Sequence, residues 1–142
     1  MTDALPSDHP SMVSHRVTLQ AVGSTNRPQL VLPDQVACDP GEYIRLTVDG
    51  TRAHATVTET LRGERAVPGA YENRRVARTG EGTDILGEWL REHGYGPGRT
   101  VVLDVLTEDY AYGVRKPGAR VVYHPVDKPN SSLADIARSL DE

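Results

Sequence analysis

Short stretches in which apolar and polar residues alternate run through the chain and predict β-strands. Residues 15–22, 43–48 and 52–57 each place apolar side chains at every second position, as a strand with one buried face requires. Weaker signals predict further strands at residues 29–32, 99–106, 110–114 and 120–124. Asp49-Gly50 joins two of the strands, and this dipeptide is typical of a tight hairpin turn. The pattern therefore predicts a mainly β protein with minor α content.

Two segments show helical periodicity instead. Residues 83–93 and 132–140 each place their apolar side chains on one face, which predicts two amphipathic helices. The apolar positions are Ile85, Leu86, Trp89 and Leu90 in the first, and Leu133, Ile136, Ala137 and Leu140 in the second. Thr83 is the expected N-cap of the first helix, and Gly94 lies just past its end. We expect Trp89 to be buried, and one helical turn at residues 33–37.

The chain of 142 residues has the length of one ordinary domain. Residues 1–14 are polar, interrupted by proline and without periodicity, which predicts a flexible N-terminal arm. Residues 15–126 hold the predicted strands and form the expected β-barrel domain, and residues 127–142 form a linker with the C-terminal helix. Residues 60–82 have no clear period, so we expect a long loop with some extended structure there.

Residues 40–48 and 97–105 resemble each other, because each begins with Pro-Gly and continues with alternating apolar positions. Each follows an apolar element and leads into a hairpin. A duplicated strand–helix–hairpin unit would close into a small pseudobarrel with approximate two-fold symmetry, and closure removes exposed sheet edges. Chance similarity is the alternative, since a turn into any half-buried strand produces the same pattern.

Charge is distributed unevenly along the sequence. The formal net charge is −4 at pH 7, yet residues 62–78 hold five arginines against two glutamates. Residues 113–120 hold Arg115, Lys116 and Arg120 with no acidic residue. The basic residues include fourteen arginines and only two lysines, which either genome composition or bidentate phosphate binding explains. Two basic islands in an acidic chain favour a polyanionic partner.

Parts of the sequence resemble known families. The unit with Leu32-Pro33, Gly41, residues 44–46 and Asp49-Gly50 resembles the swapped-hairpin units of AbrB-type regulators. Residues 86–106 are similar to the end of a plant-type B3 DNA-binding pseudobarrel. Residues 15–126, including residues 68–71 and 112–115, also resemble a family of uncharacterised haloarchaeal proteins, which implies no established activity. The first two resemblances imply a DNA-binding pseudobarrel.

The charge pattern and these resemblances together predict a nucleic-acid-binding module that grips phosphates with basic loops on a rigid barrel. Double-stranded DNA is favoured over RNA as the partner. The expected contact residues are Arg27, Arg74, Arg75, Arg78, Tyr112, Arg115 and Lys116. Tyr112 is included as a residue for base stacking. The alternative is a protein-interaction or assembly module without catalytic activity.

We find no catalytic motif and no cofactor fingerprint, and therefore expect neither an enzyme nor a bound cofactor. The five histidines lack ligand spacing and Cys38 stands alone, so no metal site is expected. No membrane-spanning run and no signal peptide is found, which predicts a cytoplasmic monomer or homodimer without membrane contact. Asp104 interrupts the apolar run of its strand and is expected to face water, or else to orient an arginine of the basic islands.

Overall fold

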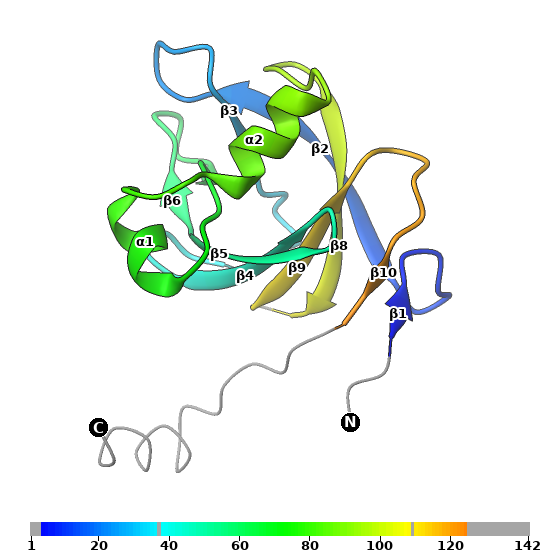
Figure 1. Ribbon diagram of the computed structural model, residues 1–142. Helices are drawn as coiled ribbons and strands as arrows, with labels where there is room; N and C mark the ends of the chain where they lie inside the picture. The colour runs from blue at the N-terminus through cyan, green and yellow to red at the C-terminus, as the bar shows by residue number, and fades with distance from the viewer. Residues whose placement is uncertain (1–3, 37, 109, 125–142) are drawn as a thin grey trace, which may run out of the picture.

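The computed structural model describes residues 4–36, 38–108 and 110–124, and these residues form a mainly β structure, as expected (Figure 1). The strands are β1 (Leu5–Pro6), β2 (Val13–Ala21), β3 (Pro28–Val31), β4 (Tyr43–Val48), β5 (Thr51–Thr56), β6 (Thr58–Glu59), β7 (Arg65–Val67), β8 (Thr100–Thr107), β9 (Ala111–Arg115) and β10 (Val122–Tyr123). The helices are α1 (Arg74–Thr79) and α2 (Ile85–Glu92). The helix expected at residues 132–140 lies outside the described residues.

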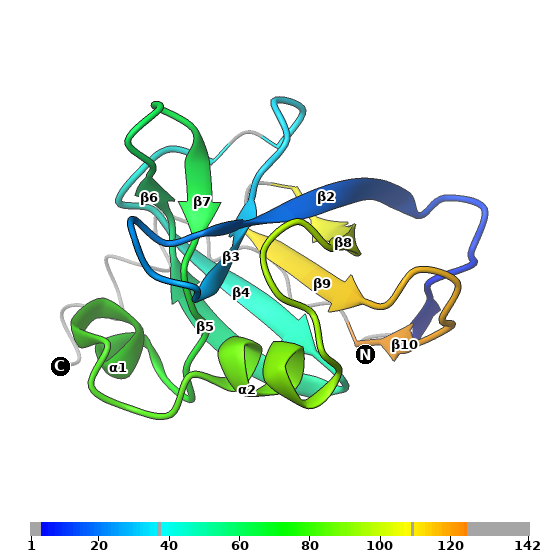
Figure 2. The ribbon, with the colours of Figure 1, turned by 90° about the horizontal axis from the view of Figure 1, so that it is seen from above.

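Eight strands form one sheet in the order β5-β4-β9-β8-β2-β3-β7-β6, which curls around the core into a nearly closed barrel (Figure 2). Neighbouring strands are antiparallel except β4 and β9, which are parallel. Tyr71, which follows β7, exchanges two backbone hydrogen bonds with His54 of β5, at 2.7 and 2.8 Å. This bridge joins the edge strand β5 to the segment after β7, near the other end of the strand order, and so nearly closes the barrel.

The barrel interior is filled by the alternate apolar positions of its strands. Ile44, Leu46 and Val48 of β4 face Val101 and Leu103 of β8 in one buried cluster. Helix α2 adds its apolar face to this cluster with Leu86, Trp89 and Leu90. Burial of such side chains contributes about 1.5–3 kcal/mol each. The expected burial of Trp89 is confirmed. The N-cap of α2 is Asp84, whereas the sequence predicted Thr83.

Some segments in which the sequence shows no periodic pattern of apolar residues nevertheless contain strands or a helix. These elements are too short to produce such a pattern. The expected loop at residues 60–82 holds β7 and α1. Within the expected N-terminal arm, β1 pairs with β10, and β2 begins at Val13. The Ser7 N–H also donates to the Val121 carbonyl oxygen. The turn at residues 33–36 is closed by a hydrogen bond from the Val36 N–H to the Pro33 carbonyl oxygen, and Ala37 lies outside the described residues.

The hairpins β4–β5 and β8–β9 lie side by side with their apolar faces inward. A two-fold axis between two adjacent hairpins that keeps both apolar faces inward reverses the direction of the strands. The two strands in contact would then be antiparallel. Instead β4 pairs in parallel with β9, and Leu46 lies opposite Tyr112. The two-fold relation expected from the sequence repeat is therefore absent from this pair of hairpins.

Candidate functional site

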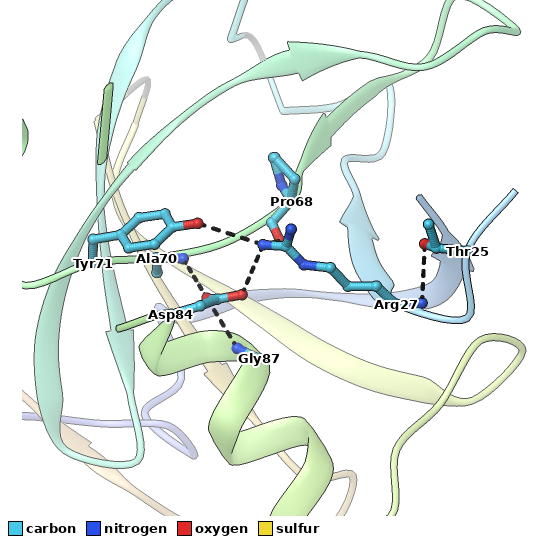
Figure 3. Close-up of polar contacts among 7 residues, drawn as sticks. All are labelled: Thr25, Arg27, Pro68, Ala70, Tyr71, Asp84 and Gly87. Carbon is cyan, nitrogen blue, oxygen red and sulfur yellow. Dashed lines mark hydrogen bonds and ion pairs between the residues drawn. The ribbon is translucent and has the colours of Figure 1, made fainter. Parts of the chain in front are cut away.

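Arg27 lies in the loop between β2 and β3 and is bound to the start of α2 (Figure 3). Its Nη2 donates to Asp84 Oδ2 at 3.0 Å, to the Pro68 carbonyl oxygen at 3.2 Å and to Tyr71 Oη at 3.4 Å. Asp84 in turn accepts from the backbone N–H groups of Ala70 and Gly87, both at 3.0 Å. The charge of Arg27 is thus compensated within the fold, and its contacts fix the loop to the helix.

Arg115 is also compensated, by a buried carboxylate. Asp104 is fully buried and accepts from Arg115 Nε at 2.8 Å and from Tyr123 Oη at 2.6 Å. Ser14 Oγ donates to the same carboxylate. The expectation that Asp104 faces water is wrong, because the side chains of Ser14, Arg115 and Tyr123 surround its carboxylate. The alternative, in which Asp104 orients an arginine of the basic islands, is what the structure contains.

Tyr112 is not a surface residue, which corrects its assignment to base stacking. It is 1% exposed and faces the barrel interior, where its Oη lies 3.1 Å from Cys38 Sγ. A base cannot reach its ring in this fold. Lys116 is exposed beyond the end of β9, with its Nζ 3.5 Å from His93 Nδ1.

Helix α1 carries three of the five arginines of the first basic island, Arg74, Arg75 and Arg78. Asn73 caps the helix by accepting from the Val76 N–H, and Gly80 ends it in the left-handed conformation, with φ 74°. No residue of α1 is buried, and Arg74, Arg75 and Arg78 are all exposed. None of them belongs to the three ion pairs found among the described residues.

The outer face of the hairpin β4–β5 adjoins this helix and carries no acidic residue. The outward side chains are Tyr43, Arg45, Thr47, Arg52, His54 and Thr56. The guanidinium of Arg74 lies over the Tyr43 ring, 4.6 Å from its centroid. Tyr43 Oη and His54 Nδ1 are hydrogen-bonded, and the two rings stack. We call Arg45, Arg52, Arg74, Arg75 and Arg78 the arginine face.

The Nε atom of Arg45 is buried without a hydrogen-bond partner. Burial lowers the pKa of the neighbouring His54, and the charge of Arg45 lowers it further. Burial also raises the pKa of Tyr43, so its phenol remains protonated at neutral pH beside the neutral imidazole. A half-buried guanidinium whose Nε makes no hydrogen bond favours a nearby anion, because a buried donor without a partner is costly.

Only a small cavity, of about 10 Å³, lies between Arg45, Arg52 and His124. It has room for one water molecule at most. An anion would therefore bind across the surface of the arginine face and not inside a pocket.

The two basic islands lie on opposite sides of the barrel. Figures 1 and 2 both place α1 on one side and the loop after β9 on the other. In the parallel pairing of β4 with β9, Arg45 lies opposite Ala111 and Val48 lies opposite Val114. Lys116 follows Val114 by two residues, so it lies beyond the Val48 end of β4, and Tyr43 is at the other end. A six-residue strand spans about 20 Å. The islands therefore do not form one positive surface.

Sequence reasoning missed Tyr43, Arg45, Arg52 and His54 as site residues. The signal was present, because the Asp49-Gly50 turn places Arg45 opposite His54 on the outward side of the hairpin. Clusters were sought along the chain, whereas this one forms across two strands and is completed by Arg74 from a distant helix.

Within the described ranges, no group of three or more His, Cys, Asp or Glu side chains is placed to hold a metal ion. The helices in the described part of the chain are too short and too polar to cross a bilayer.

Comparison with protein families finds one that matches almost the whole chain. The model of a family of unknown function (DUF7112) matches residues 1–140. Searches of curated proteins and of solved structures gave no significant match. The description of the family assigns no activity, so the function is argued from the geometry above.

Proposed function

Because the chain belongs to a family of unknown function (DUF7112), we propose from its own geometry that it binds nucleic acid through the arginine face. The role is one of binding and not of catalysis. The observation that carries the proposal is the stack of Arg74 on Tyr43, next to Arg45 with its unpartnered Nε. Tyr43 and Arg45 lie on β4, and the outward positions of β4 and β5 hold no acidic side chain.

The chemistry is neutralisation of backbone phosphates by guanidinium groups. Arginine presents a planar fork that binds phosphate oxygens in a bidentate manner. Contact with about four phosphates gives a slope of log K against log salt of roughly −3.6 for duplex DNA, because condensed counterions are released. Binding that depends on salt to this degree is the main signature of the proposed function.

The resemblances of the sequence support the same proposal. The AbrB-type and B3-type similarities imply DNA binding by a pseudobarrel, and the haloarchaeal similarity implies a host with concentrated salt. At about 1 M salt the Debye length is about 3 Å. Only close contacts remain strong under such conditions, and bidentate arginine contacts are of this kind.

The test compares two double variants that remove equal charge from different surfaces. Arg75→Ala with Arg78→Ala removes two exposed arginines of the arginine face, whereas Arg62→Ala with Arg91→Ala removes two exposed arginines elsewhere. Binding of labelled duplex and single-stranded oligonucleotides is measured by fluorescence anisotropy over a salt series. We expect the first pair to weaken binding to every sequence and to reduce the salt slope by about two. We expect the second pair to bind as the parent does.

Equal weakening by both double variants would show that only net charge matters and would remove the arginine face as the interface. Lys116→Ala gives a further check, because Lys116 lies at the far end of the barrel and its loss should not alter binding. Absence of salt-sensitive binding at every ionic strength at which the parent is folded would overturn the proposal.

A protein-interaction module is the second candidate, and specific observations favour it. Arg27, Arg115 and Arg120 are each neutralised by an aspartate within the fold. Leu61 is fully exposed at the tip of the β6–β7 loop, beside a groove of about 870 Å³. Sedimentation of the parent and of Leu61→Ser tests self-association through this loop. Association of the parent that Leu61→Ser abolishes, without any nucleic-acid binding, would favour this function.

A further inference from the structure

The Tyr43 ring is held so that a planar group can lie on its solvent side. His54 stacks with the ring at a centroid distance of 5.6 Å and bonds its hydroxyl, and the buried Tyr110 meets it edge-on at 6.2 Å. The planar group on it now is the guanidinium of Arg74. Arg74 is exposed whereas Tyr43 is half-buried, so the guanidinium can leave the ring while the ring stays in place.

The shape of the arginine face does not suit insertion into a duplex. Helix α1 has six residues and is therefore about 9 Å long. It lies against β5, with its first arginine on the Tyr43 ring. Reading of a major groove requires a helix or ribbon that projects into the groove. A hairpin face with a half-buried tyrosine can reach only the phosphates of a duplex, whose base faces are already stacked on one another.

A single strand can offer its bases to the same surface. Bases stack on aromatic rings and on arginine planes, and this contact tolerates any base because every base has a π-face. Arg45 and Arg52 occupy outward positions on adjacent strands, diagonal to each other across the hairpin, and both border the small cavity next to His124. The Arg52 guanidinium is exposed and is held by a hydrogen bond to the His124 carbonyl oxygen at 3.0 Å, so it is positioned to contact the backbone of a stacked strand.

On the basis of the proposed function, we infer that the ligand class is single-stranded nucleic acid, with one base stacked on Tyr43 in the position of the Arg74 guanidinium. The displaced guanidinium contacts a flanking phosphate, and the exposed guanidinium of Arg52 contacts a further phosphate along the strand. This inference differs from the preference for duplex DNA that the pseudobarrel resemblances imply. It predicts little sequence preference, since stacking carries little base information.

The experiment uses three ligands of equal length: a mixed-sequence single strand, its duplex, and an abasic strand that keeps the sugars and phosphates. Anisotropy at one salt concentration gives the three affinities for the full chain. We expect the parent to bind the mixed-sequence strand about tenfold more tightly than the abasic strand or the duplex, in line with the loss of one stacked base. A 2-aminopurine strand should lose fluorescence on binding, which reports stacking without any substitution.

A matched pair of variants locates the stacked base. Tyr43→Leu removes the proposed platform, and Tyr95→Leu is the control, because Arg99 lies over Tyr95 in a similar contact at 5.6 Å on another part of the surface. We expect Tyr43→Leu to weaken binding of the mixed-sequence strand about tenfold and to leave the abasic strand unchanged. Tyr43→Trp should restore binding, and Tyr95→Leu should not change it.

The outcomes separate this inference from the proposed function. Equal affinity of the parent for the mixed-sequence strand, the abasic strand and the duplex would overturn the stacking inference and leave phosphate binding in place. Tighter binding of the duplex than of the single strand would also overturn it. Failure of all three ligands to bind would overturn the inference together with the proposed function.

Discussion

At the scale of single residues, the Asp104 carboxylate connects several segments of the chain. Its oxygens accept hydrogen bonds from Ser14 on β2, Arg115 on β9 and Tyr123 on β10. Burial and the hydrogen bond to Asp104 raise the pKa of Tyr123, so the phenol keeps its proton and continues to donate. A buried charge is tolerated only when it is paired and hydrogen-bonded, and these donors meet that condition.

Asp104→Asn removes the charge while keeping the shape of the side chain. The Arg115 side chain, only 14% exposed, then retains a charge without its partner. We expect the free energy of unfolding to fall by about 3–5 kcal/mol, measured by urea denaturation. Asp8→Asn is the control, because Asp8 pairs with Arg120 on the exposed surface, where such pairs contribute little. Equal losses in the two variants would contradict this account.

His54 makes stability depend on pH. Burial and Arg45 lower the pKa of its imidazole below the ordinary value of 6.5, so the unfolded chain binds a proton there before the folded one does. Stability contributed by the neutral imidazole is therefore lost as the pH falls from 6.5 toward the lowered pKa. We expect His54→Gln to lose less unfolding free energy than the parent between about pH 7.5 and about pH 5.5.

Urea denaturation over a pH series measures this difference. Parallel pH profiles of His54→Gln and the parent would show that His54 does not cause the dependence.

At the scale of elements, β10 is held in place by packing more than by its two paired residues. The Tyr123 ring lies directly on the backbone of Gly113 in β9. A Cβ atom at position 113 would lie 2.2 Å from Cε1 of that ring. Glycine at position 113 therefore lets the Tyr123 ring of β10 approach β9 closely. This close approach allows Tyr123 to donate its hydrogen bond to Asp104.

Gly113→Ala should displace Tyr123 and break its hydrogen bond to Asp104. Overpacking and a lost hydrogen bond to a buried charge together should reduce the free energy of unfolding by at least about 2 kcal/mol. Urea denaturation of Gly113→Ala and Gly96→Ala checks this, because no atom lies within 4 Å of a Cβ added at Gly96. If the two variants are equally stable, the packing argument for β10 is wrong.

At the scale of the whole molecule, closure of the barrel makes most elements depend on one another. The pairing of His54 with Tyr71 joins the edge strand β5 to the segment after β7, and α2 packs into the same core as β4 and β8. The arginine face belongs to this closed unit, since Tyr43, Arg45, Arg52 and His54 lie on two of its strands. The positions of its charges are therefore set by the same contacts that stabilise the fold.

We expect the barrel and α2 to unfold in a single cooperative transition. Trp89 is the one tryptophan in the sequence and lies in α2, so its fluorescence reports the helix, whereas far-UV circular dichroism reports mainly the sheet. The two signals should give the same urea midpoint, as two-state unfolding requires. A fluorescence transition at lower urea would show that α2 detaches before the barrel opens.

The sequence by itself determined the local elements whose burial pattern repeats over several residues. The strands at residues 43–48 and 52–57, and the hairpin between them, follow from period-two alternation and the Asp49-Gly50 turn. Helix α2 follows from its apolar stripe. Burial of one face imposes these periods on the chain, and they can be recognised without knowledge of any distant contact. Strands of two or three residues, such as β1 and β7, are too short to show them.

Only the tertiary structure decided which charged and aromatic groups remain available for a ligand. Arg27 pairs with Asp84, 57 positions away, and the outward side chains of β4–β5 acquire Arg74 from a separate helix. Tyr112 is buried because its side chain faces the core of the barrel. Electrostatic compensation and burial depend on distance in space, and clustering along the chain does not measure that distance.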